Sequence, residues 1–76
     1  MTSEGTLEIT PEGWGFLRQT AGAPSDQDAY VSQHQIQRFR LKTGDVIRGE
    51  ARPPRVVEGE KYYGLWRIET INGQEL

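Results

Sequence analysis

The stretch Gly13-Trp14-Gly15-Phe16-Leu17-Arg18 is typical of a β-strand that carries its aromatic side chains outside the core. Side chains alternate between the two faces of a strand. Trp14, Phe16 and Arg18 therefore share one face, and Leu17 points the other way, into the core. Large aromatics normally prefer burial, so two of them on the polar face indicate a surface with a function.

A second stretch, Asp28-Ala29-Tyr30-Val31-Ser32, repeats this inverted arrangement. Asp28 and Tyr30 fall on one face of the expected strand, and the small apolar Ala29 and Val31 fall on the other. The aromatic is again on the polar face, here beside an acid.

The composition bounds the fold to one small domain. The chain has 76 residues, no cysteine, nine glycines and four prolines. Frequent turn residues favour a turn-rich, all-β fold over a helical bundle. We expect a frayed start over residues 1–5, one domain over residues 6–73 and a short tail over residues 74–76. With no signal peptide or long apolar run, we expect a cytoplasmic protein that is not attached to a membrane.

Five strands are predicted, with one helical turn between the third and the fourth. Ser32 is a candidate N-cap with Gln35 three residues on, and Ile36 and Phe39 would anchor the turn. This order matches a five-stranded oligonucleotide-binding (OB-fold) barrel, with an SH3-like barrel as the structural rival. The strands are expected at Thr6–Ile9, Trp14–Gln19, Asp28–Ser32, Val46–Arg52 and Glu60–Ile71, with a polar loop over Thr20–Gln27.

Gly49 lies inside the predicted fourth strand. A glycine there indicates a bulge or a sharp bend of the kind found at barrel corners.

Charge is unevenly distributed along the chain, although the formal net charge is only −2. Residues 38–55 contain six arginines and lysines and only two acids. Such a local excess would attract phosphate groups. A solvated edge strand and loop would show the same pattern, so charge alone leaves both interpretations open.

Aromatic side chains in line with an arginine are suited to binding single-stranded nucleic acid, because bases stack on aromatic and guanidinium planes. Asp28 would repel phosphate but can accept a hydrogen bond from the amino group of cytosine, and Arg18 can donate to the acceptors of the same base. The alternative is a surface ion pair between Asp28 and Arg18 that contributes little.

A second cluster, Glu60-Lys61-Tyr62-Tyr63, again combines an acid, a base and aromatics. The two tyrosines point to opposite faces of a regular strand, and the sequence does not decide which one lies in the core. Trp66 shares its parity with both Tyr62 and Ile68, so this strand has no clean division into faces.

Nothing in the sequence supports catalysis. The chain has a single histidine, His34, with no second ligand type at metal-site spacing, and no nucleophile set or phosphate-binding loop. We therefore expect a binding protein that is not an enzyme and needs no metal or cofactor.

The chain resembles the cold-shock-like RNA-binding subdomain of the bacterial transcription termination factor Rho over nearly its whole length. The segment Ile36–Asp45, followed by Arg52-Pro53-Pro54, is more specific than the aromatic pattern, which general cold-shock proteins share. The matching stretches are Leu7–Arg18, Asp28–Asp45, Ile47–Pro54 and Gly59–Gly73.

The resemblance implies a five-stranded OB-fold barrel that binds single-stranded, pyrimidine-rich and especially cytosine-rich RNA. Trp14 and Phe16 would form a stacking platform, and Arg18 and Asp28 would bind the cytosine edge. The neighbouring pyrimidine would be enclosed by a further set, Tyr30, Glu60 and Tyr62, with Lys61 beside them. The family's hexameric ATPase motor has no counterpart in the sequence, so the expectation is RNA binding by a monomeric domain without ATP hydrolysis.

Two other functions fit the residues. One is a general cold-shock-type binder of single-stranded nucleic acid, which would also take single-stranded DNA. The other is a protein-interaction β-barrel, for which the acidic overall charge speaks.

Overall fold

The computed structural model describes residues 1–19 and 24–76, so residues 20–23 of the predicted loop lie outside the described residues. The elements are β1 (Thr2–Ile9), β2 (Gly15–Arg18), β3 (Ala29–Val31), α1 (Gln33–Phe39), β4 (Val46–Arg52), the 3₁₀ turn η1 (Val56–Glu58), β5 (Tyr63–Ile71) and β6 (Gln74–Glu75). None of the helices in these two ranges is long and apolar enough to cross a membrane.

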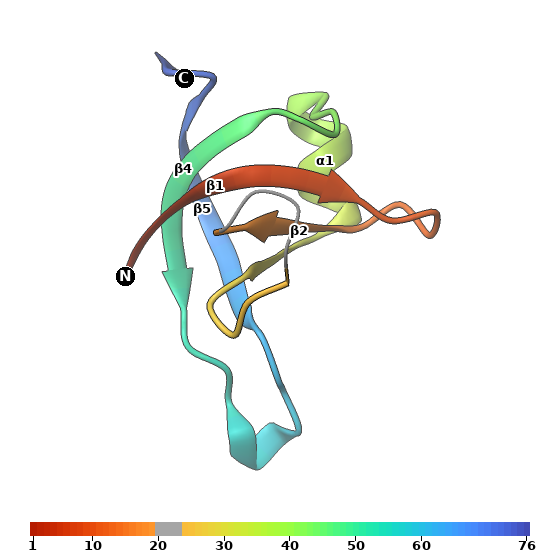
Figure 1. The fold of residues 1–76 in the computed structure, drawn as a ribbon, viewed down its shortest axis with the longest axis vertical. Helices are drawn as coiled ribbons and strands as arrows, with labels where there is room; N and C mark the ends of the chain where they lie inside the picture. Colours follow the sequence, from red (N-terminus) through yellow and green to blue (C-terminus); the bar gives the residue numbers. More distant parts are fainter. Residues whose placement is uncertain (20–23) are drawn as a thin grey trace.

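The strands form a closed barrel, as predicted. Their order is β3-β2-β1-β4-β5-β6, and β3 also pairs with β5, which joins the two sides of the sheet. This closing pair is parallel, whereas the other pairs are antiparallel, so the barrel is mixed. Figure 1 shows β1 crossing in front of β5, with the connection between β4 and β5 extending below the barrel. The OB-fold prediction, with a helix between the third and fourth strands, is confirmed.

The core confirms the predicted alternation of the first strands. Leu17, Ala29 and Val31 are fully buried, whereas Phe16 is half-buried and Tyr30 exposed. The buried set is Leu7, Leu17, Ala29, Val31, Ile36, Leu41, Ile47, Ala51, Leu65 and Ile68.

Both ends of the chain belong to the sheet, where the sequence suggested a frayed start and a short tail. β1 begins at Thr2 and pairs with β4 from that residue on, and Ser3 is buried. The N-terminal ammonium group contacts the Glu50 carboxylate at 3.2 Å. At the other end Gln74 pairs with Ile71. Their polar composition suggested fraying. Strand pairing, however, satisfies the backbone N–H and C=O groups of a segment whatever its side chains are.

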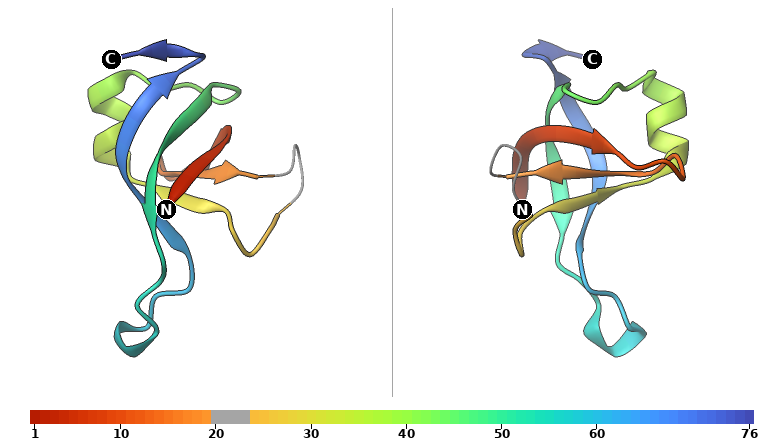
Figure 2. Two further views of the ribbon diagram at one scale, coloured as in Figure 1. Left: turned by 90° about the vertical axis from the view of Figure 1, so that its left-hand side faces the viewer. Right: turned by 45° about the vertical axis from the view of Figure 1, so that its right-hand side comes forward.

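α1 is longer than the single turn predicted, but it begins as expected. The Ser32 side chain accepts a hydrogen bond from the Gln35 backbone N–H, and the Gln35 side chain accepts one from the Ser32 backbone, which forms a capping box. Arg40 ends the helix in the left-handed conformation. Gln35 also donates to the backbone carbonyl of Leu65 at 2.8 Å, which ties the helix to β5. The left-hand view in Figure 2 shows α1 beside β5.

The pairing of β4 with β5 is irregular at Gly49, as predicted, and again between Glu50 and Ala51. Arg48 and Gly49 pair with Thr70 and Ile68, so Glu69 is an extra residue in β5. Glu50 and Ala51 pair with Arg67 and Leu65, so Trp66 is an extra residue in β5. Gly49 itself faces inward, where a Cβ atom would collide with the carbonyl oxygen of Arg67. The glycine therefore permits the close approach of β5, and both extra residues, Glu69 and Trp66, lie in β5.

Candidate nucleic-acid interface

Four aromatic side chains form a continuous row: Phe16 on β2, Tyr30 on β3, and Trp14 and Tyr62 directly before β2 and β5. The rings of Trp14 and Phe16 meet edge to face, with centroids 5.1 Å apart. Trp14 also contacts Tyr30 at 5.5 Å, and Phe16 contacts Tyr62 at 5.0 Å. Phe16 and Tyr30 are direct cross-strand partners. Each of the four rings is thus positioned by another ring or a strand pairing before any ligand arrives.

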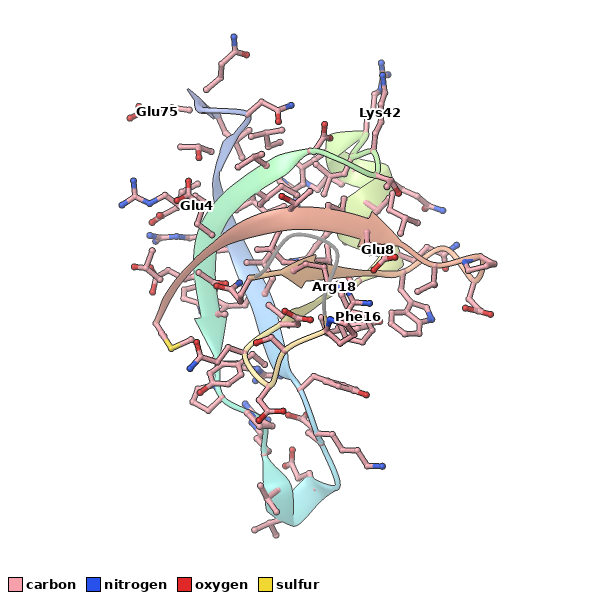
Figure 3. All side chains as sticks on the ribbon, viewed as in Figure 1. Glu4, Glu8, Phe16, Arg18, Lys42 and Glu75 are labelled. Carbon is pink, nitrogen blue, oxygen red and sulfur yellow. The ribbon has the colours of Figure 1, made fainter. Side chains whose placement is uncertain are left out.

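The guanidinium of Arg18 lies beside this row and is held from two sides. Its Nε donates to Glu8 Oε1 at 2.7 Å, and its Nη1 donates to Asp28 Oδ2 at 2.8 Å. Its Cζ lies 4.8 Å from the centre of the Phe16 ring. Figure 3 shows Glu8, Arg18 and Phe16 side by side at the centre of the barrel wall. The arginine is therefore oriented in advance against the aromatic row.

Asp28 lies beneath this surface, not on it. Its side chain is only 2% exposed, which corrects the alternative of a surface ion pair. Oδ1 accepts from the Gln19 backbone N–H, and Oδ2 accepts from the Ser25 backbone N–H as well as from Arg18. Burial acts to raise the pKa of Asp28, but the hydrogen bonds from Gln19, Arg18 and Ser25 outweigh it and lower the pKa. The carboxylate is thus kept charged where it can hold Arg18.

The pKa of Arg18 is shifted in the opposite direction, upwards. Its hydrogen bond to Asp28 raises the pKa of Arg18, an effect that its partial burial reduces and that Glu8 reinforces. The guanidinium is a permanent donor at this position.

A pocket of about 330 Å³ adjoins the aromatic row where β5 begins. Tyr30, Glu60, Lys61 and Tyr62 line it together with Arg52. The Glu60 carboxylate accepts a hydrogen bond from the backbone N–H of Arg55, which anchors it across the loop between β4 and β5. A flat ligand that enters this pocket would contact two tyrosine rings, the negative Glu60 and the positive Lys61 and Arg52.

The structure brings all eight residues singled out in the sequence to one side of the barrel. Trp14, Phe16, Arg18 and Asp28 form one group, and Tyr30, Glu60, Lys61 and Tyr62 form the adjoining pocket.

The structure also separates the two tyrosines that sequence parity left open. Tyr62 is 52% exposed and meets Phe16, whereas Tyr63 packs against the core.

Two residues of this region were missed in the sequence. Glu8 is exposed on β1 opposite Phe16, and the alternation of the first strand was the signal available for it. Arg52 was noted for the local excess of positive charge and for the family resemblance but not as a site residue, although it lines the pocket. No group of three histidine, aspartate or glutamate side chains within residues 1–19 and 24–76 is arranged to hold a metal ion.

Residues 3–76 match the family described as Rho termination factor, RNA-binding domain. The chain belongs to this family. The match includes every element of the barrel and both groups of the candidate site, so the resemblance drawn from the sequence is confirmed. The matched part is the RNA-binding region of Rho and not its ATPase region.

Curated Rho proteins from distant bacteria are similar to almost the whole chain. The transcription termination factor Rho of Bacillus subtilis is 49% identical over 73 residues, which cover 95% of the chain and 17% of that protein. The Rho proteins of Thermotoga maritima and Aquifex aeolicus are 52% and 53% identical, over 91% and 92% of the chain and 16% of each relative. The chain thus spans about a sixth of the length of these relatives.

Proposed function

We propose that this domain binds single-stranded, pyrimidine-rich RNA with a preference for cytosine, as the primary RNA site of a transcription termination factor. The observation that carries the proposal is the aromatic row with Arg18 held against it by Glu8 and Asp28. Stacking supplies affinity without sequence preference, whereas a fixed guanidinium supplies directed donors. The membership in the RNA-binding family supports RNA as the partner.

One base binds against the surface that Trp14 and Phe16 form, stacked on one of these nearly perpendicular rings, with its edge towards Arg18. Cytosine presents the acceptors N3 and O2 on its pairing edge, and the guanidinium donates to them. Asp28 acts chiefly through Arg18, because its oxygens already accept three hydrogen bonds and its side chain is buried.

The adjoining pocket takes the neighbouring pyrimidine. Tyr30 and Tyr62 enclose the base, Glu60 accepts from it, and Lys61 lies near the phosphate that joins the two nucleotides. The pocket volume of about 330 Å³ is on the scale of one base and its sugar.

Titration with the dinucleotides CC, UU and AA at low salt tests the proposal. Binding of CC that exceeds binding of AA by tenfold or more is expected for a site that combines stacking with edge recognition. Equal or absent binding of all three would overturn it. Equal affinity for the DNA dinucleotide dCdC would favour the general cold-shock-type binder.

The variant Phe16→Ala tests whether the aromatic row is the surface that binds RNA. It removes the central ring of the row, and we expect loss of CC binding with the barrel still folded, because Phe16 is only half-buried. Trp66→Ala is the matched control, since it removes an exposed aromatic that contributes no ring to the row. Backbone NMR shifts that stay unmoved by CC at Trp14 and Phe16 would instead favour a protein-interaction barrel.

The larger context is part of the proposal. The relatives are termination factors of which the chain covers about a sixth, and we assign this domain the capture of RNA for such a factor in the bacterial cytoplasm. ATP hydrolysis and ring assembly belong to other parts of those proteins, and the isolated domain acts as a monomer.

A further inference from the structure

A second, larger groove lies between α1 and β5, beyond the pocket at Tyr62. Its volume is about 570 Å³. Its walls include Trp66 and Arg67 from β5, Arg38 and Phe39 from α1, and Arg52 from the end of β4. None of the eight residues in the proposed site other than Tyr30 lines it.

The β5 bulge creates the aromatic wall of this groove. In a regular strand, Trp66 and Arg67 would point to opposite faces. Because Trp66 is an extra residue opposite Glu50 and Ala51, both side chains instead face outward, between the buried Leu65 and Ile68. Trp66 is 58% exposed, and the Arg67 guanidinium lies 5.6 Å from its ring centre. A large flat ring is thus left open at the surface beside a positive charge.

The groove is positive. Arg38, Arg52 and Arg67 line it, and no aspartate or glutamate of residues 1–19 and 24–76 does so. Arg67 has one carboxylate partner, Glu69, at 2.7 Å; the Arg67 side chain is exposed and that of Glu69 is partly buried. The Arg38 guanidinium lies over the ring of Phe39 at 5.5 Å. The domain as a whole has a net charge of −2, so this grouping of arginines is a local exception. Arginines around an exposed tryptophan favour a ligand that is anionic and carries a flat ring.

The groove continues directly from the proposed site. Tyr30, Arg52 and Gly64 line both this groove and the pocket of about 330 Å³ that contains Tyr62. A strand that leaves the pocket therefore passes Arg52 as it enters the groove. Gln35 holds α1 against β5 through the Leu65 carbonyl, so the groove exists before a ligand binds.

We propose that this groove is a third nucleotide subsite, in which a base stacks on Trp66 and the flanking phosphates lie against Arg38, Arg52 and Arg67. This inference rests on the proposed function, because it extends the same RNA strand. The subsite accepts any base. It offers a stacking plane and cations, but nothing equivalent to Arg18 fixed between two carboxylates. Its role is to strengthen binding of the strand beyond the cytosine-reading pair of subsites.

Length-dependent binding tests the inference. The affinities of CC, CCAA and AACC are measured for the wild-type domain and for Trp66→Ala. We expect one of the two tetranucleotides to bind more tightly than CC by about 5- to 150-fold, the range for one stacked base. Trp66→Ala should abolish that gain and leave CC binding unchanged. Trp66→Phe, which retains a smaller stacking plane, should keep part of it.

Matched variants separate stacking from charge. Arg38→Ala should reduce the tetranucleotide gain and its salt dependence, whereas Arg48→Ala removes an equal charge from an exposed position that does not line the groove. Replacing the two adenosines by abasic nucleotides should remove the gain that depends on Trp66. In NMR spectra, the indole N–H signal of Trp66 should shift with the tetranucleotide but not with CC.

The outcomes distinguish the two proposals. If CC does not bind, the proposed function fails. If CC binds but neither tetranucleotide binds more tightly, or if the gain survives Trp66→Ala in a folded domain, the third subsite is wrong and the groove serves another partner.

Discussion

Nη1 of Arg18 lies 2.8 Å from Oδ2 of Asp28, and the carboxylate of this pair is almost completely buried. A buried carboxylate that is fully hydrogen-bonded fixes the guanidinium above it, since breaking the pair would leave an uncompensated charge. The exposed Glu8 holds the same guanidinium from the other side. The fold therefore fixes Arg18 at the position where we propose that it contacts RNA.

Asp28→Asn should destabilise the domain by about 1–3 kcal/mol, because a neutral amide cannot match the charge-assisted bond to Arg18 and turns a donor group towards backbone donors. Urea unfolding measures the loss. Glu8→Gln alters only an exposed partner and serves as the control, with an expected loss below about 1 kcal/mol. Equal losses for the two variants would contradict the assigned difference in burial.

Low pH should reduce the stability of the domain through the Asp28 carboxylate. The pKa of Asp28 is lowered in the folded state, so its contribution to stability is complete above its unfolded value of about 4 and is lost as the pH falls through the lower folded value. Glu50, whose pKa is lowered by hydrogen bonds from Thr2 and the N-terminus, acts in the same direction. Thermal unfolding between about pH 5 and pH 2 should show this decline. Asp28→Asn should make the curve flatter, and an unchanged slope would refute the assignment.

Tyr62→Ala and Tyr63→Ala should have opposite effects. Tyr62 is exposed and contacts Phe16, so its loss should weaken RNA binding and leave unfolding nearly unchanged. Tyr63 packs against the core, and its loss should lower the free energy of unfolding by about 2 kcal/mol or more. Titration and urea unfolding of both variants check this pair. A stable Tyr63→Ala that fails to bind RNA would reverse the assignment.

Gly49→Ala should disrupt the β4–β5 pairing, because the added methyl group would meet the backbone carbonyl of Arg67. We expect a loss of several kcal/mol or failure to fold, since backbone on both sides must move. Gly64→Ala is the control in the neighbouring strand, where the nearest atom outside its neighbours is 3.9 Å away. Comparable melting temperatures for the two variants would show that β5 does not approach β4 as closely as described.

Ser32→Ala should lower stability by about 1 kcal/mol by removing the side-chain acceptor of the capping box. Ser32→Asn restores an acceptor and should recover most of the loss. Urea unfolding of the two variants measures the difference. If both variants lose the same amount, the cap does not contribute through this hydrogen bond.

Local patterns predicted most of the barrel. The alternation around Phe16 and Tyr30 predicted which face of the strands carries the aromatic rings, and the spacing of Ser32 and Gln35 predicted the helix start. Both follow from periodicity and from hydrogen bonds between residues a few positions apart, which do not depend on the rest of the fold. The alternation of side chains did not predict which way Trp66 points. It is an extra residue in its strand, and an extra residue can be recognised only from the pairing with the partner strand.

The amino-acid sequence determined that this chain forms a small barrel with outward aromatics, and that Arg18 and Asp28 would be neighbours. Only the tertiary structure decided that Asp28 is buried beneath Arg18, that Tyr62 and not Tyr63 joins the aromatic row, and that Trp66 opens onto a positive groove. The physical reason is closure of the barrel. The β3–β5 pairing brings together segments that are distant in the chain, and the register of β4 against β5 then sets which side chains face outward.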